Sequence, residues 1–115
     1  MDTRQDRQET NSSADAAGKQ DALHHIAIQV DNVQTALDWY TSKFNCVVEY
    51  VDETWAYLRF ENIKVALVVP GQHPPHICFM SADAAKFGDL KNHRDGTKSV
   101  YVKDPAGNSV EILQE

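Results

Sequence analysis

The sequence predicts an α+β domain built from two βαβββ units, the second of them shortened. A strand-like run, HIAIQV, leads into a helical pattern, and three further strand-like runs follow it without another helix. A second opening run, HICFMS, resembles the first, and a hairpin closes the chain. With 115 residues, 42% of them hydrophobic, the chain is long enough to bury one modest core.

The first predicted strand covers residues 24–30. Because side chains alternate along a strand, Ile26, Ile28 and Val30 share one face, which should meet a helix, and His25 lies on the other. That histidine therefore faces away from the expected core.

A helix is predicted directly after this strand, because apolar residues recur at helical spacing over residues 33–44. Asp31 is the expected N-cap, with Gln34 three positions later, and Asn45 is the expected stop. The helix should cover the apolar face of the first strand.

Three more strands complete the first unit, at residues 46–51, 55–60 and 63–69. Glu61 and Asn62 form the expected hairpin turn between the last two strands. A Pro-Gly pair then ends the unit.

The second unit begins with a strand at His76 and continues with a short helix predicted around residues 82–92. Its closing hairpin, SVYVKD and SVEILQ, is joined by residues 105–108. Little more than HRDGTK stands where the strand after the helix is expected, which is why this unit is called shortened.

Three strand residues form a candidate metal site: His25, His76 and Glu111. Two imidazoles and a carboxylate on one sheet match a 2-His-1-carboxylate site, suited to Zn, Mn, Fe, Co or Ni. The alternative is a site without metal, in which His25 and Glu111 are hydrogen-bonded to each other.

Four further residues are candidates for substrate binding or catalysis. Trp55, Tyr57 and Arg59 share the strand face that carries His25, as walls and an anion anchor. Arg59 has an alternative role, pairing with a carboxylate such as Glu49. Tyr101 lies on the Glu111 face of the closing hairpin, and these two are the candidate catalytic residues. Tyr101 either donates a proton or hydrogen bond to a metal-bound oxyanion or packs across the strands.

Other histidines and a cysteine are expected to be ordinary. His24 points opposite to His25 by alternation, and His73 and His93 lie in loops, so all three are expected at the surface. Cys78 is expected to be a small core residue.

Charge and hydropathy exclude several partners. The net charge of −6 contains no basic block, which argues against nucleic acid and anionic membranes. No run approaches the roughly 18 apolar residues of a membrane span. Beyond Met1, residues 1–21 carry no large apolar side chain. This stretch is predicted to be a disordered tail, or else a helix formed on a partner, before a domain at 22–115. A cytoplasmic location is expected.

The motifs HIAI, HIC and SVYVKDPAGNSVEI together resemble the vicinal oxygen chelate superfamily, the glyoxalase, bleomycin-resistance and dioxygenase fold, over residues 22–115. The resemblance implies that the two units pair into a curved, cup-shaped mixed sheet. It also implies metal ligation by His25, His76 and Glu111, with Ala66 where four-ligand members carry another ligand. Three ligands resemble the plan of the thiol transferases and dioxygenases, and Tyr101 resembles a substrate-contacting tyrosine.

The functional expectation is a divalent-metal-dependent enzyme, a lyase, transferase or dioxygenase, acting on a small oxygen-rich substrate. The alternative is a metal-free small-molecule binding protein of the bleomycin-resistance type. A homodimer is also expected; in a swapped dimer, His25 of one chain would join His76 and Glu111 of the other.

Overall fold

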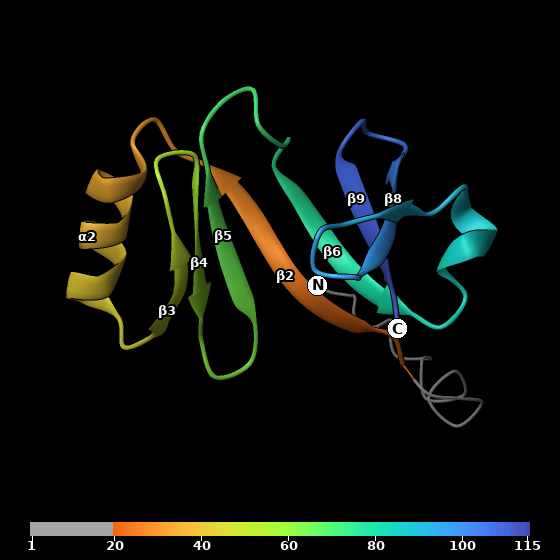
Figure 1. The fold of residues 1–115 in the computed structure, drawn as a ribbon, viewed down its shortest axis with the longest axis horizontal. Coiled ribbons are helices and arrows are strands. Elements are labelled where there is room, and N and C mark those ends of the chain that lie inside the picture. Colours follow the sequence, from red (N-terminus) through yellow and green to blue (C-terminus); the bar gives the residue numbers. More distant parts are fainter. Residues whose placement is uncertain (1–19) are drawn as a thin grey trace, which may run out of the picture.

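The computed structural model describes residues 20–115, which form one mixed sheet of eight strands in the order β3-β4-β5-β2-β6-β9-β8-β7 (Figure 1). The first unit comprises β2 (Ala22–Gln29), α2 (Val33–Lys43), β3 (Val47–Val51), β4 (Trp55–Arg59) and β5 (Lys64–Val68). The second comprises β6 (His76–Ser81), η1 (Ala84–Phe87), β7 (Lys91–Asn92), β8 (Lys98–Lys103) and β9 (Ser109–Gln114). The predicted α+β class and paired units are confirmed. Most of the predicted tail, residues 1–19, lies outside the described part of the chain.

The two units are related by an approximate twofold axis between β2 and β6. Each first strand pairs in parallel with the last strand of its own unit, as β2 does with β5 and β6 with β9. The two first strands pair with each other antiparallel, which joins the units into one sheet. Residues at matching positions of the two units can therefore be compared directly.

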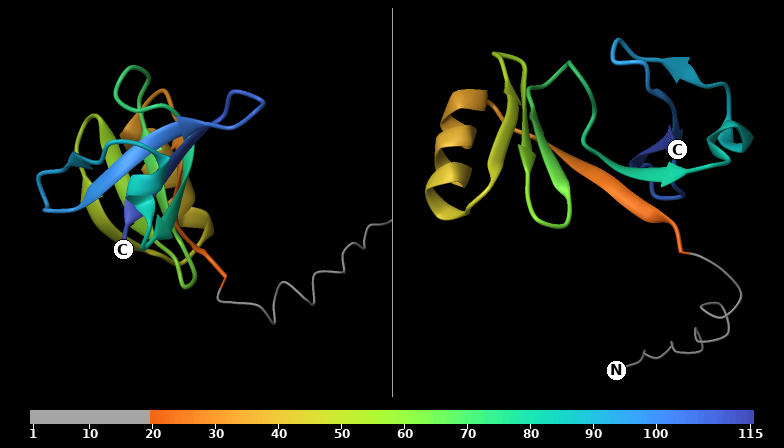
Figure 2. Two further views of the ribbon diagram at one scale, coloured as in Figure 1. Left: turned by 90° about the vertical axis from the view of Figure 1, so that its right-hand side faces the viewer. Right: turned by 60° about the horizontal axis from the view of Figure 1, so that its bottom comes forward.

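The core of the first unit lies between α2 and the sheet, and Figure 2 shows α2 and η1 at opposite ends of the molecule. Val33 and Leu37 of α2 pack on Ala56, Leu58 and Leu67, three residues with no exposed surface. This is the face that alternation predicts. At about 25 cal/mol per Å² of buried apolar area, such packing is the main stabilising contribution of the helix.

The predicted N-cap of this helix was wrong by one residue. Asn32, not Asp31, adopts extended backbone, and its Oδ1 accepts a hydrogen bond from the Thr35 N–H at 2.8 Å. The C-cap is Phe44 rather than Asn45. Both side chains at the N-terminus are good caps, so the sequence alone does not choose between them.

The helix predicted around residues 82–92 is also wrong, because only the 3₁₀ helix η1 forms, over Ala84–Phe87. Its N-cap, Asp83, makes no capping hydrogen bond with its side chain. Gly88 follows with φ of +153°, and a Cβ there would lie 3.0 Å from Val100 Cγ2. The helix ends here and the backbone passes close to β8, at a position where a residue other than glycine would be strained.

The chain then reaches β7, a two-residue strand at the edge of the sheet. Ala84 and Val100 pack with Ile112 in a small separate core under η1. No helix in the described residues is long and apolar enough to cross a membrane.

Candidate metal centre

The three predicted metal ligands converge within one chain, from β2, β6 and β9. His25 Nε2 lies 3.1 Å from His76 Nε2 and 3.4 Å from Glu111 Oε1, and His76 Nε2 lies 3.1 Å from the same oxygen. His76 and Glu111 are buried and His25 is nearly so. The sequence predicted these residues correctly as neighbours, and no second chain is needed to bring them together.

The triangle of ligand atoms has the size that a transition metal requires. A metal about 2.1 Å from each ligand would hold neighbouring ligand atoms about 3.0 Å apart at right angles and about 3.4 Å apart at tetrahedral angles. The observed edges of 3.1, 3.1 and 3.4 Å fall in this range. The donor set therefore fits a divalent metal with further coordination positions left for water or substrate.

His76 is held in the tautomer that a metal ligand needs. Its Nδ1 lies 2.7 Å from the carbonyl oxygen of Pro74, which can only accept, so Nδ1 carries a proton. In the neutral ring Nε2 then has the lone pair that a metal would take, whereas in the protonated ring the second proton, on Nε2, is donated to Glu111. Burial alone would lower the pKa of His76, but the hydrogen bonds to Glu111 and Pro74 outweigh burial and raise it.

His24 supports His25 in a similar way, and its predicted surface position was wrong. The β2–β6 register shifts between Leu23 and His25, so a β-bulge turns His24 toward the site face. Its Nδ1 lies 2.8 Å from His25 Nδ1 and 3.5 Å from the Tyr57 hydroxyl. Burial and the charge of His25 lower the pKa of His24, which favours a neutral imidazole. If His25 binds a metal through Nε2, its remaining proton lies on Nδ1 and His24 Nδ1 is placed to accept it.

Glu111 divides its two oxygens between the ligand triangle and a supporting network. Oε1 faces the imidazoles, whereas Oε2 accepts a hydrogen bond from Ser99 Oγ at 2.8 Å. Since Ser99 has a single proton, His93 Nε2, 2.7 Å from Ser99 Oγ, must donate. Burial would raise the pKa of Glu111, but hydrogen bonds from His25, His76 and Ser99 hold it far below its usual range.

The sequence thus missed two histidines. The sequence pattern gave no signal for the bulge at His24, since a bulge of one extra residue leaves the alternation of apolar and polar residues intact before and after it. His93 lies in a loop, and its distance to Ser99 depends on how the β7–β8 hairpin folds back. Only the abundance of histidine in a short chain hinted at further members of the site.

A second group of potential ligand atoms, from His24, His25 and Cys78, shares His25 with the first group. Cys78 pairs directly with His25 across the two first strands and has no exposed surface. Burial and the charge of Glu111 raise the pKa of the Cys78 thiol, so the sulfur keeps its proton and is a poor ligand. The buried position agrees with the predicted core role.

Matching positions of the two units show why the site has three ligands. Tyr101 pairs with Glu111 across β8 and β9, and Tyr57 pairs with Ala66 across β4 and β5. Ala66 therefore occupies the place that Glu111 holds in the second unit. A methyl group cannot ligate a metal, so this position adds no fourth protein ligand to the candidate site.

Two tyrosines flank the histidines in matching positions. The Tyr57 ring contacts His25 edge-on, with ring centres 5.6 Å apart, and the Tyr101 ring contacts His76 at 5.2 Å. The Tyr101 hydroxyl is 3.5 Å from His76 Nε2. Burial, together with the negative charges of nearby groups, Glu111 among them, raises the pKa of both phenols, so each keeps its proton at neutral pH.

The other predicted substrate-binding residues divide into two groups. Trp55 lies beside Tyr57, with ring centres 5.3 Å apart, and stacks on Tyr50 at 4.8 Å, which extends an aromatic wall away from His25. Arg59 is half exposed and its Nε donates to Glu49 Oε2 at 2.7 Å. The ion pair that was the alternative role of Arg59 is therefore formed.

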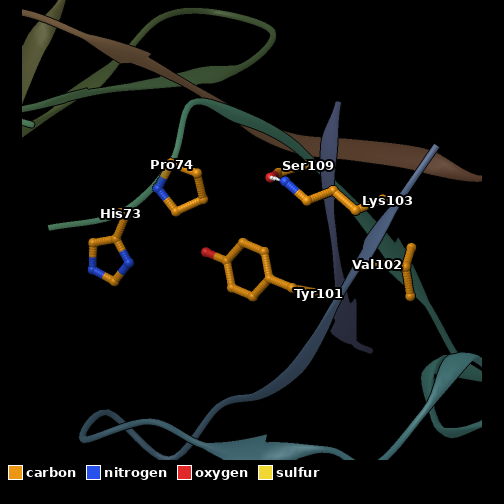
Figure 3. Close-up of a pocket in the computed structure, with 6 residues that line it drawn as sticks. All are labelled: His73, Pro74, Tyr101, Val102, Lys103 and Ser109. Carbon is orange, nitrogen blue, oxygen red and sulfur yellow. Dashed lines mark hydrogen bonds between the residues drawn. The ribbon is translucent and has the colours of Figure 1, made fainter. Parts of the chain in front are cut away.

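A cavity of about 280 Å³ opens beside Tyr101. In Figure 3 the Tyr101 hydroxyl points toward Pro74 and His73, while the Lys103 ammonium lies against Ser109. Tyr101 thus borders both this cavity and the ligand triangle. A molecule bound in the cavity would lie next to the candidate metal position.

No protein-family model matches the chain, and no curated protein matches its sequence. Solved structures do match its fold. A glyoxalase/bleomycin resistance protein/dioxygenase superfamily member from Vibrio splendidus 12B01 is 13% identical, with a TM-score of 0.63 over 84% of this chain and 100% of that one.

Methylmalonyl-CoA epimerase from Mycobacterium tuberculosis is 12% identical, with a TM-score of 0.61 over 80% of this chain and 86% of that one. A hypothetical protein from Bacillus halodurans C-125 is 15% identical, with a TM-score of 0.61 over 84% and 96%. Likeness at these identities concerns the fold. The chain has the glyoxalase/bleomycin resistance/dioxygenase fold of the vicinal oxygen chelate superfamily, as its motifs predicted.

Proposed function

We propose that the protein is a divalent-metal-dependent enzyme that acts on a small, oxygen-rich substrate. The observation that carries this proposal is the triangle of His25 Nε2, His76 Nε2 and Glu111 Oε1, with edges of 3.1 to 3.4 Å. Three ligands leave positions where two vicinal oxygens of a substrate can bind. A metal held there supplies Lewis-acid stabilisation of negative charge on a substrate oxygen.

The surrounding residues fit this role because each ligand is oriented by a partner. The Pro74 carbonyl accepts from His76, His24 Nδ1 is placed to accept from a metal-bound His25, and Ser99 donates to the second oxygen of Glu111. Such supporting hydrogen bonds are typical of metal sites and typically change metal affinity by about 10- to 100-fold.

Tyr101 is the proposed acid of the reaction. Its hydroxyl lies near the ligand triangle, borders the cavity and keeps its proton, so it can donate a hydrogen bond or proton to a developing oxyanion. Glu111 serves as a ligand whose charge also favours the protonated form of this phenol. Trp55 and Tyr57 would form one wall for the substrate.

The first test is elemental analysis with a thermal-shift series in Zn, Mn, Fe, Co and Ni. We expect about one metal per chain in the wild type and a rise in Tm that disappears in Glu111→Gln, which keeps the shape of the side chain but removes its charge. Glu53→Gln, in an exposed turn, is the matched control and should behave as wild type. Absence of metal from the wild-type protein at micromolar concentration would overturn the proposal.

A second candidate function is metal-free binding of a cationic aromatic compound. The stack of Tyr50, Trp55 and Tyr57, in a chain of net charge −6, supports it. Tight binding of such a compound that persists in the presence of chelator would favour this function, and binding that requires metal would exclude it. The expected homodimer stays a prediction for either function.

A further inference from the structure

We propose that the cavity beside Tyr101 binds the carboxylate end of a substrate whose other end chelates the metal. The inference rests on the proposed function and names its substrate class: small 2-oxo or 2-hydroxy acids that carry a second, terminal carboxylate. Lys103 is the residue that recognises this carboxylate.

The cavity lies between the loop before β6 and the β8–β9 hairpin (Figure 3). At about 280 Å³ it is of a size to hold part of a small substrate. Its lining residues are His73, Pro74, Tyr101, Val102, Lys103 and Ser109. The walls are largely apolar, and one side chain among them carries a permanent positive charge.

The cavity adjoins the candidate metal centre through three of its lining residues, although none of the three candidate ligands lines it. Tyr101 borders both, Pro74 lines the cavity and accepts from His76 Nδ1, and Ser109 is the direct partner of His76 in the β6–β9 register. A substrate whose chelating oxygen lies near His76 would therefore extend past the Tyr101 hydroxyl into the cavity.

Lys103 is available for an anion. Its Nζ donates to Ser109 Oγ at 3.0 Å, and among residues 20–115 no carboxylate forms an ion pair with it. The matching positions in the first unit differ, because Arg59 and Lys64 there both pair with Glu49. In the second unit Lys103 stands at the position of Arg59, and no described carboxylate pairs with it as Glu49 does with Arg59.

The spacing sets the length of the substrate. Tyr101 and Lys103 are two residues apart on the same face of β8, a separation of about 6.6–6.8 Å along the strand. Tyr101 pairs with the ligand Glu111, and Lys103 with Ser109. A chain of about five carbons spans this interval, with its chelating oxygens at the level of Glu111 and its carboxylate at the level of Lys103.

The test uses cobalt-loaded full-length protein and two probes of equal length. 2-Oxoglutarate carries the terminal carboxylate, and 2-oxopentanoate has a methyl group in its place, with the same chelating end. Titration calorimetry gives the two Kd values, and the visible spectrum of Co²⁺ reports metal loading separately. We expect wild-type protein to bind 2-oxoglutarate at least about tenfold more tightly, the gain typical of a charge-assisted hydrogen bond.

Two lysine variants separate recognition from net charge. Lys103→Met should bring the ratio of Kd values close to one, while Lys98→Met, on the opposite face of the same strand, should keep the wild-type ratio. A cobalt-loaded protein that binds both probes equally, or a Lys103→Met variant that keeps the preference, overturns the carboxylate subsite and leaves the metal centre intact. A protein that takes up no cobalt overturns the proposed function and this inference with it.

Discussion

At the scale of single residues, the orientation of the two ligand histidines depends on what their Nδ1 atoms bind. His76 uses a backbone carbonyl, which no side-chain substitution removes. His25 uses the side chain of His24, which a bulge places 2.8 Å away. The His25 ligand is therefore the one whose support can be tested by mutation.

Replacing His24 by alanine should weaken metal binding by about tenfold or more, because His25 loses the acceptor that fixes its tautomer and ring orientation. His24→Asn offers an amide oxygen to the same proton and should recover most of the affinity. Titration with Co²⁺ followed by absorption gives both values. Equal affinities for wild type and His24→Ala would show that His25 needs no such support.

At the scale of elements, the β8–β9 turn holds two site-bearing strands in register. Asp104 accepts hydrogen bonds from the backbone N–H groups of Ala106 and Asn108 and from the Asn108 side chain, at 2.8 to 2.9 Å. The Asn108 side-chain bond is the main reason that the pKa of Asp104 lies below its ordinary value, with the backbone bonds adding to it. The hydrogen bonds of this turn thus help to hold Tyr101 of β8 opposite Glu111 of β9.

Asp104→Ala should lower the Tm at neutral pH, since the turn loses three hydrogen bonds. A carboxyl whose folded pKa is lowered contributes its stability above the unfolded pKa and loses it as pH falls through the folded pKa. The Tm difference between wild type and variant should therefore shrink on acidification. Thermal unfolding at pH 7 and at successively lower pH measures this, and a difference that grows in acid would contradict it.

Element boundaries also show where sequence reasoning succeeded. The strands other than β7, and α2, follow hydrophobic periodicity, and that pattern was sufficient to find them. The two-residue strand β7, Lys91–Asn92, was missed because it lies within the helix predicted around residues 82–92. The predicted second helix failed because η1 ends at Gly88, where close packing on Val100 outweighs helical propensity. Hydrophobic periodicity predicts which face of a helix or strand is buried. It does not predict a contact such as that of Gly88 with Val100, which depends on a residue in another strand.

At the scale of the whole molecule, the candidate ligands His25, His76 and Glu111 were predictable because each lies on a strand face whose other residues are hydrophobic or neutral. Their convergence came from resemblance, and the register of β2, β6 and β9 now accounts for it. The bulge at His24 and the fold-back of His93 were not predictable, since both depend on tertiary placement. In this structure all three ligands come from one chain.

A mixing experiment tests this closure within one chain. His25→Ala and Glu111→Ala each remove one ligand, and in a swapped dimer a mixture would rebuild one complete site from the two chains. We expect the co-refolded mixture to bind no more metal than the separate variants. Recovery of metal binding in the mixture, up to one site per mixed dimer, would show that the site is shared between chains.

The approximate twofold axis between β2 and β6 relates Tyr57 to Tyr101 but opposes Ala66 to Glu111. A cup with equivalent halves would receive a molecule and its half-turned copy equally well. Here one half carries the carboxylate and Lys103, which forms no ion pair within residues 20–115, and the other carries a methyl group and a stack of aromatic rings. The two halves of the duplicated scaffold are therefore chemically different, and the two enantiomers of a chiral molecule would meet different surroundings within it.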